Sequence, residues 1–201
     1  MFRNIYSCVL LIWMLSTAAL ADAVFNLWID APAEVQAGST FTISVWGQVS
    51  GSVLNEGDGA MSALSMDLLA EGVSATFSEA RRVEMGLLDL GTPSSNMLEG
   101  ILGINHPSFF PFWTTNPSRL IEIDLTLAPG SIGTIELIPA PNAEREYLLA
   151  WWADYNDLVF VSDADPGSTR VITPATVNVI PAPGAAALLT MAGLGTLRRR
   201  R

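Results

Sequence analysis

The stretch Leu120-Ile121-Glu122-Ile123-Asp124-Leu125-Thr126-Leu127 alternates apolar and polar side chains from Ile121 onward. Successive side chains of a β-strand point to opposite faces, so this alternation predicts a strand with one buried and one solvated face. The same pattern recurs at residues 25–29, 41–45, 64–68, 73–77, 135–137 and 177–179. The sequence therefore predicts a set of amphipathic strands.

Turn-forming residues separate these strands, at residues 37–39, 55–59, 128–130 and 165–167. Glycine, proline, asparagine and aspartate favour turns because they allow backbone angles or local hydrogen bonds that strands do not use. Short strands with one wet face each predict an all-β, antiparallel β-sandwich in a single domain. The rhythm of residues 32–45 and 120–137 resembles that of sandwiches of the cohesin and carbohydrate-binding-module type.

Two stretches depart from this pattern. Residues 78–90 carry apolar side chains at near-helical spacing, which allows at most one or two helical turns there; these side chains are Ala80, Val83, Leu87 and Leu90. Pro139-Ala140-Pro141 is followed by a charged run and is predicted to form a turn.

The N-terminus has the parts of a secretory signal peptide. Arg3 supplies a positive charge, residues 8–20 are almost all apolar, and small residues suited to signal peptidase end at Ala21 and at Ala23. We expect cleavage after Ala23, with cleavage after Ala21 or an uncleaved anchor as alternatives. The only cysteine, Cys8, leaves with the signal, so the mature chain is expected to have no disulfide.

The C-terminus also has three parts: Pro181-Ala182-Pro183, the uncharged run 184–197, and Arg198-Arg199-Arg200-Arg201. The prolines interrupt any strand that arrives from upstream. A helix over the uncharged run would cover roughly 21 Å, less than the ~30 Å hydrocarbon core of a bilayer, so the run predicts a temporary tether. The arginines would stay on the cytoplasmic side. A buried C-terminal helix is the alternative.

These features resemble the PEP-CTERM sorting signal, which exosortases recognise in Gram-negative bacteria. That family has a Pro-Glu-Pro-like motif, a short hydrophobic helix and a basic cluster in this order, and the resemblance covers about the last 22 residues. Ala182 stands where the family usually has Glu, as in Pro-Ala-Pro variants of planctomycete type. The resemblance implies an inner-membrane exosortase as a transient partner, cleavage near Pro181–Pro183, and attachment of the mature protein to a surface glycan.

The chain is thus expected to comprise a signal peptide (1–23), a β-sandwich domain (24–178) and a sorting tail (179–201). Residues 24–180 contain five arginines, nineteen acidic residues and no lysine, which gives a net charge of −14. A surface this acidic repels phosphate backbones and excludes nucleic acid as a partner. We expect an exported protein, tethered at the inner membrane as a precursor and then placed at the cell surface or outside the cell.

Residues with catalytic chemistry are scarce. His106 is the only histidine, and the chain contains no nucleophile elbow, zinc-protease helix motif or phosphate-binding glycine loop. The sequence therefore predicts a structural or binding protein rather than an enzyme. A small secreted hydrolase without a recognisable catalytic motif is the alternative, because paired carboxylates are recognised by their distance in space.

Two acidic loops could hold calcium, which is bound by six to eight oxygen atoms. Asp154 and Asp157 belong to one loop, and Asp163 and Asp165 to the next. Neither loop matches the EF-hand pattern, and aspartates also favour turns through their own side-chain hydrogen bonds. We expect no obligatory cofactor, with calcium at these aspartates as the alternative.

Two aromatic groups are candidates for stacking on sugar rings. Trp113 ends the aromatic run 109–113, and Trp152 follows Trp151 beside the first acidic loop. Neighbouring residues of a strand face opposite ways, so at most one of this second pair should lie in the core. The alternative is that the rings fill the core or cover its ends. The sequence thus predicts a surface or matrix protein with a structural or binding sandwich, or alternatively a carbohydrate- or calcium-binding adhesion module whose partner is a surface polysaccharide.

Overall fold

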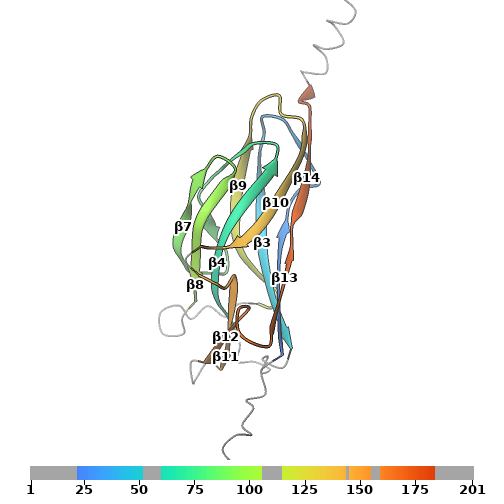
Figure 1. The fold of residues 1–201 in the computed structure, drawn as a ribbon. Helices are drawn as coiled ribbons and strands as arrows, with labels where there is room; N and C mark the ends of the chain where they lie inside the picture. The colour runs from blue at the N-terminus through green and yellow to red at the C-terminus, as the bar shows by residue number, and fades with distance from the viewer. Residues whose placement is uncertain (1–21, 52–59, 106–114, 144, 155–158, 184–201) are drawn as a thin grey trace, which may run out of the picture.

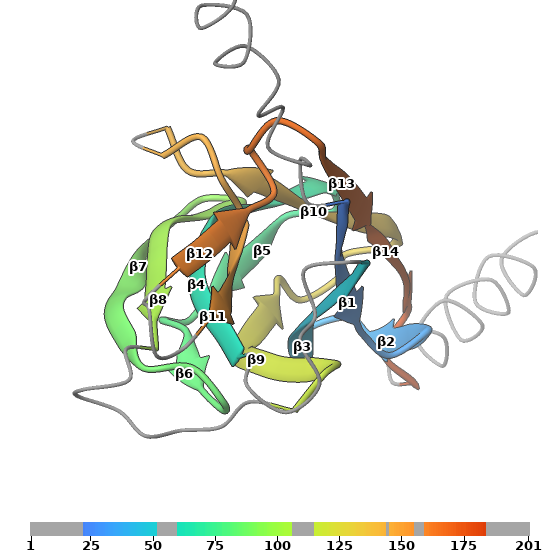
Figure 2. The same cartoon turned by 90° about the horizontal axis from the view of Figure 1, so that it is seen from below.

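The computed structural model describes residues 22–51, 60–105, 115–143, 145–154 and 159–183, in which the regular structure is β-strand. Two sheets, A and B, pack face to face around one apolar core (Figure 1). Viewed from one end, they curve around this core as two layers (Figure 2). The expected all-β sandwich is confirmed. No helix within these ranges is long and apolar enough to cross a membrane.

Sheet A has the strand order β13-β1-β3-β9-β5, and β6 also pairs with β9. Its strands are β1 (Ala23–Asp30), β3 (Thr40–Gly51), β5 (Ala75–Phe77), β6 (Arg81–Arg82), β9 (Ser118–Leu127) and β13 (Ser168–Thr173). The central strands β3 and β9 are antiparallel, with a register shift between Val45 and Trp46.

Sheet B is organised around β4 (Ala60–Gly72), which pairs with β8 along one edge and with β10 and β11 along the other. Strand β7 continues the sheet beyond β8, while β14 and β2 continue it beyond β10, and β12 beyond β11. These strands are β2 (Glu34–Gln36), β7 (Leu87–Ser94), β8 (Met97–Ile104), β10 (Gly133–Pro141), β11 (Leu149–Asp154), β12 (Val159–Ser162) and β14 (Ala175–Ile180).

The stretch with the clearest alternation forms β9, and its four inner side chains are buried as predicted. Ile121, Ile123 and Leu125 are 0% exposed, and Leu127 is 1% exposed. All four belong to the core cluster that both sheets share. Burying one such side chain stabilises the fold by about 1.5–3 kcal/mol, so the apolar face of β9 accounts for a sizeable part of the core energy.

Two strand pairs are parallel, whereas the sequence predicted an antiparallel sandwich. Strand β1 pairs in parallel with β13 in sheet A, and β2 pairs in parallel with β14 in sheet B. The consecutive strands β1 and β2 pass from sheet A to sheet B, and so do β13 and β14. These two segments of the chain therefore remain paired with each other in both sheets. The described chain therefore enters the sandwich at one end and leaves it at the other (Figure 1). Alternation within a strand carries no information on the direction of its neighbour.

Residues 78–90 do not form the helical turns that their spacing allows. The backbone N–H groups of Ser78, Val83 and Glu84 donate to carbonyl oxygens of β9, which lie across the sheet rather than one helical turn back. Val83 and Leu90 are 41% and 42% exposed, so these two residues do not share a buried face with Ala80, which is 2% exposed. The segment forms β6 and the first half of β7.

Pro139-Ala140-Pro141 is the end of β10 rather than the predicted turn. Strand β14 pairs with β10 only over Gly133–Leu137, so in the described part of the sheet the rest of β10 is paired with β4 alone. Proline has no N–H to donate and is tolerated in a strand where one edge is free. The prolines therefore fit this position.

The ends of the described sandwich differ slightly from the predicted boundaries. Strand β1 begins at Ala23, which is 0% exposed, and β14 ends at Ile180. Residues 1–21 of the predicted signal peptide (1–23) and the predicted C-terminal hydrophobic helix, residues 184–197, lie outside the described residues.

Candidate functional site

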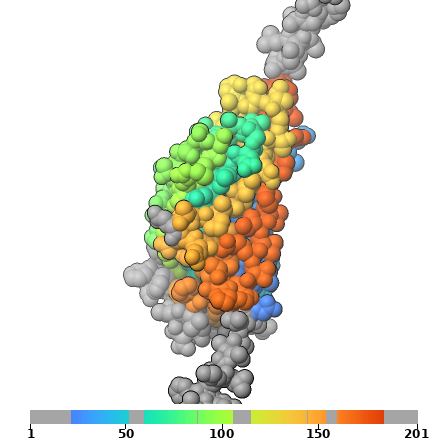
Figure 3. Space-filling view, viewed as in Figure 1, coloured from blue at the N-terminus to red at the C-terminus, as the bar shows by residue number. Residues whose placement is uncertain are grey.

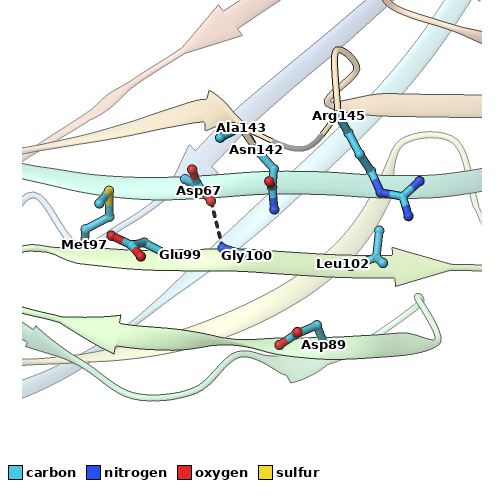
Figure 4. Close-up of a pocket in the computed structure, with 9 residues that line it drawn as sticks. All are labelled: Asp67, Asp89, Met97, Glu99, Gly100, Leu102, Asn142, Ala143 and Arg145. Carbon is cyan, nitrogen blue, oxygen red and sulfur yellow. Dashed lines mark hydrogen bonds between the residues drawn. The ribbon is translucent and has the colours of Figure 1, made fainter.

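The outer face of sheet B carries a hollow of about 520 Å³. Figure 3 shows this face, on which β7 and β8 (green) lie beside β4 (teal). In Figure 4 these three strands form the floor of the hollow, and the chain after β10 borders it beside β4. The lining residues are Asp67, Asp89, Met97, Glu99, Gly100, Leu102, Asn142, Ala143 and Arg145.

A β-bulge shapes the floor of this hollow. In the pairing of β4 with β8, the single residue Asp67 faces both Glu99 and Gly100. Gly100 has a φ of 77°, a conformation that favours glycine because residues with a Cβ are strained there. Its N–H donates to Oδ1 of Asp67 at 2.7 Å (Figure 4). Bulges of this kind re-aim side chains and are common beside functional sites.

The hollow brings both signs of charge to one surface. Oδ1 of Asp89 accepts the N–H of Gly91 at 3.0 Å, whereas Glu99 is exposed and its carboxylate has no hydrogen bond or ion pair within the described residues. Nη1 of Arg145 lies 3.2 Å from the hydroxyl of Tyr147, and its guanidinium carbon lies 6.0 Å from the centre of that ring. No carboxylate in the described part of the chain pairs with Arg145. Within the described residues, neither Glu99 nor Arg145 is therefore neutralised by an opposite charge.

The hollow is lined by charged, amide and apolar side chains. Its lining residues include no histidine, cysteine, serine or threonine, and its ionisable groups are the carboxylates of Asp67, Asp89 and Glu99 and the guanidinium of Arg145. Across the described residues, no group of three or more His, Cys, Asp or Glu side chains is placed to hold a metal ion. None of the residues that line the hollow was predicted as a site residue from the sequence. The hollow depends on the register of β4 against β8 and on the path of the chain after β10, which local sequence patterns do not encode.

Asp163, one of the four candidate calcium ligands, is buried in an ion pair. Its carboxylate accepts hydrogen bonds from Nε and Nη2 of Arg170 at 2.7 and 3.1 Å, and from the N–H of Leu148 at 3.0 Å. Nη2 of Arg170 also donates to the carbonyl oxygen of Glu146 at 2.7 Å. These bonds tie β13 to the segment before β11, so both oxygens of Asp163 have protein partners.

The other three candidate ligands are described only in part. Oδ2 of Asp165 accepts the N–H of Ser162 at 2.7 Å, which closes the turn between β12 and β13. Asp154 is the last residue of β11, but its side chain lies outside the described part of the structure, as does the whole of Asp157. In the described loop, the carboxylates of Asp163 and Asp165 thus accept hydrogen bonds that stabilise the fold.

Both adjacent tryptophans are buried, but on different sides of the sheet. Trp151 is 3% exposed and belongs to the core cluster, whereas Trp152 is 9% exposed and lies outside it. The indole N–H of Trp152 donates to the carbonyl oxygen of Asn105 at 2.9 Å, and Phe160 packs edge-on against its ring, with 5.9 Å between ring centres. Trp152 therefore presents no open face for a sugar. Trp113 lies outside the described residues.

Sheet A carries a row of ion pairs on its outer face. Arg81 of β6 binds both oxygens of Asp124 on β9, and the hydroxyl of Thr42 donates to Oδ1 of Asp124 at 2.6 Å. The bonds from Arg81, and secondly from Thr42, favour the charged carboxylate and hold the pKa of Asp124 below its ordinary value. Arg119 forms a similar pair with Glu122.

Two tryptophans on the same outer face stack on each other. Trp28 of β1 and Trp46 of β3 have ring centres 6.0 Å apart and planes only 8° from parallel. Neither is among the predicted site residues, although the sequence carries the signal: Trp28 occupies an outward position in the alternation of residues 25–29, and Trp46 follows the inward Val45. A large aromatic residue on the polar side of an amphipathic strand marks an exposed apolar surface.

The predicted sorting motif follows the last strand directly. Pro181 and Pro183 are exposed and Ala182 is half-buried, immediately after β14 ends. The four arginines of the predicted basic cluster, Arg198 to Arg201, lie outside the described residues.

No protein-family model and no curated protein sequence matches the chain. Among solved structures, a cohesin from a type I cohesin–dockerin complex of Clostridium thermocellum aligns over 78% of this chain and 99% of its own, with a TM-score of 0.51 and 9% identity. The third cohesin of ScaC from Acetivibrio cellulolyticus, in complex with the ScaB dockerin, covers 77% and 99%, with a TM-score of 0.48 and 11% identity. The first likeness shows the cohesin type of sandwich, which the rhythm of the sequence had indicated.

Proposed function

We propose that the protein is an exported binding module of the cell surface or extracellular matrix, and that the hollow of sheet B receives a folded protein partner. The observation that carries this proposal is the placement of two available charges, Glu99 and Arg145, beside the apolar side chains of Met97 and Leu102. Protein interfaces commonly combine an apolar centre with a polar rim, and arginine is enriched among the residues that carry their energy. The role is one of recognition rather than catalysis.

The fold supports the same role. The Clostridium thermocellum cohesin was solved in a complex with a dockerin, so in that protein a sandwich of this type receives another protein. Here the floor of the hollow consists of three paired strands, which hold their side chains in fixed positions. The net charge of −14 over residues 24–180 would speed the approach of a partner with a basic surface.

Site-specific photo-crosslinking in the producing bacterium tests this proposal. A photoreactive amino acid at Glu99 should yield one discrete adduct with another protein, because Glu99 lies at the rim of the hollow. The same amino acid at Ile132, which is 65% exposed in the turn before β10, is the matched control and should yield none. Arg145→Glu should weaken binding about tenfold or more, as truncation of an interface arginine commonly does. Equal yields at Glu99 and Ile132 would contradict the proposal.

The termini support the second part of the proposal, export and sorting. The exposed Pro181 and Pro183 directly after β14 leave the motif accessible to a membrane protease, while the sandwich itself stays folded. We infer that signal peptidase removes the N-terminal segment and that an exosortase cleaves near Pro181–Pro183 and transfers the domain to a surface glycan.

Mass spectrometry of the protein recovered from its native surface tests the sorting step. The expected C-terminus lies near Pro183, and the mass should lack residues 184–201. A variant with Arg198 to Arg201 replaced by serine is the control, and it should accumulate uncleaved. Recovery of the surface protein with its four arginines intact would refute sorting, while leaving the binding proposal to the crosslinking result.

A further inference from the structure

The outer face of sheet A carries a ladder of side chains from the neighbouring strands β1 and β3. Asn26 pairs in register with Gln48, and Trp28 pairs with Trp46, while Asp30 follows on the same face. Side chains directly opposite in such a pair are roughly 5 Å apart, and successive residues on one face of a strand are about 7 Å apart. The five side chains therefore form one continuous surface.

The two indole rings form a rigid apolar platform at the centre of this surface. Each ring is half-buried and lies outside the core cluster, so part of its apolar surface is open to solvent. Together with Ile29 and Asp30, the rings line a hollow of about 290 Å³. Because the rings stack at 6.0 Å with nearly parallel planes, each restricts the rotation of the other. A ligand that packs on them would not have to order them first.

The polar groups around the platform are available for hydrogen bonds. Within the described residues, the side chains of Asn26, Gln48 and Asp30 and the indole N–H groups of Trp28 and Trp46 have no hydrogen bond or ion pair. Each amide offers donors and an acceptor, each indole offers a donor, and the carboxylate offers acceptors. Apolar rings are thus flanked by amides on one side and by a carboxylate on the other.

The charges on this face disfavour an anionic ligand. Arg81 and Arg119 reach this face and already bind Asp124 and Glu122, whereas Arg82 of β6 pairs with the inward Ile121 and so faces the other way. Asp30 adds a negative charge, so a sulfate, phosphate or uronate group would meet repulsion without a free cation to neutralise it. A neutral pyranose fits better, because its C–H faces pack on an aromatic ring while its hydroxyls at the ring edge both donate and accept.

We propose that Trp28 and Trp46 form a binding site for a neutral polysaccharide. One pyranose ring packs on the exposed indole surface, and its hydroxyl groups bond to Asn26, Gln48 and Asp30. The site lies on the sheet opposite the hollow of sheet B, so it goes beyond the proposed protein-binding role. The domain then holds a protein on one face and a glycan on the other.

Affinity electrophoresis in native gels tests this site with the full chain. Gels contain hydroxyethyl cellulose, galactomannan or xyloglucan as neutral probes, alginate as an anionic probe, or no polysaccharide. We expect retardation by at least one neutral probe and none by alginate. Trp28→Ala should weaken that retardation about tenfold or more, since truncating a tryptophan at a binding centre commonly has this effect. Phe160→Ala removes another aromatic ring, 58% exposed, and is the matched control that should bind normally.

A second variant is needed to separate loss of the binding site from loss of the fold, because Trp28→Ala also removes a packed ring. The double variant Asn26→Ala/Gln48→Ala leaves both rings in place and should weaken binding with an unchanged melting temperature. Arg145→Glu, which alters the other face, should bind the glycan normally, so failure of the protein-binding proposal remains distinguishable. Absence of retardation by every neutral probe, equal retardation by alginate, or full retardation of both platform variants would overturn the site. Conversion of a dimer to a monomer by Trp28→Ala would likewise overturn it and assign the face to a second copy.

Discussion

Asp163 and Arg170 illustrate how a single buried charge constrains this fold. The side chain of Asp163 is 1% exposed and that of Arg170 is 27% exposed. Removing either partner would leave the other charge poorly solvated, which would destabilise the folded state. We predict that Asp163→Asn lowers the free energy of unfolding by roughly 3 kcal/mol. Arg170→Met should lower it by at least as much, because it leaves the buried carboxylate of Asp163 without its cationic partner. The double variant should recover part of the loss. Chemical denaturation measures all three, and additive losses in the double variant would contradict a coupled pair.

The same pair allows a direct test of calcium binding. Both oxygens of Asp163 already accept hydrogen bonds from Arg170 and Leu148, so a calcium ion would have to displace them. The midpoint of thermal unfolding should therefore be the same in calcium and in EDTA. A rise with calcium that Asp163→Asn abolishes would show that the aspartates bind the ion after all.

Asp124 gives the protein a small, directional dependence on pH. Hydrogen bonds from Arg81 and Thr42 lower its pKa in the folded state, so its contribution is fully present above its ordinary pKa of about 3.9 and is lost as the pH falls through the folded value. The side chains are 46% and 32% exposed for Arg81 and Asp124, so we expect at most about 1 kcal/mol. Asp124→Asn should be less stable than the parent at pH 7 and equally stable near pH 2, with Thr42→Val intermediate. Urea unfolding at both pH values measures this, and a constant difference would exclude linkage through this carboxyl.

At the scale of single elements, the strands with strict alternation could be predicted, and those without it could not. Strand β9 buries every residue of its apolar face, so the alternation in its sequence is sufficient to predict which side chains point to the core. Strand β7 exposes Leu88 and Leu90 and contains Pro93, so the pattern of its residues does not predict a buried face. Its position depends on pairing with β8, a contact between segments that local pattern does not encode.

The pairing of β1 favours the alternative signal cleavage site, after Ala21, over the expected one after Ala23. Ala23 is 0% exposed and pairs with both β3 and β13, and the absence of a Cβ at Gly51 leaves room for the carbonyl oxygen of Asp22. Cleavage after Ala23 would remove this pairing, whereas cleavage after Ala21 retains it. We therefore predict that the exported protein begins at Asp22.

Intact-mass measurement of the exported protein checks this prediction. A chain that starts at Val24 should also lose about 1–3 kcal/mol of stability, because the partners of Ala23 keep backbone groups without hydrogen bonds. Replacing Ala21 with a bulky residue is the control that should block the preferred cleavage. An exported protein that begins at Val24 and is as stable as the longer chain would contradict the assignment.

For the whole molecule, the parallel pairs connect the fold to the proposed tether. The N-terminal segment β1–β2 lies along the C-terminal segment β13–β14 across both sheets, and the chain leaves at the end opposite to its entry (Figure 1). A protein attached at one terminus and pulled at the other would load these strands along their length. The hydrogen bonds between strands run across that direction, so they would bear the load together rather than one after another.

This geometry predicts a strong dependence of mechanical stability on the points of attachment. Single-molecule pulling between residues 22 and 183 should require a higher force than pulling between residues 130 and 183, at the same loading rate. The second pair opens β10 and β14 from their shared end, where Gly133 pairs with Val179, so their bonds break in sequence. Val171→Pro removes an N–H from β13 and should lower the force in the first geometry more than in the second. Equal forces in the two geometries would show that the terminal strands are not the load-bearing contact, and that the opposite placement of the chain ends serves only to separate the tether from the binding faces.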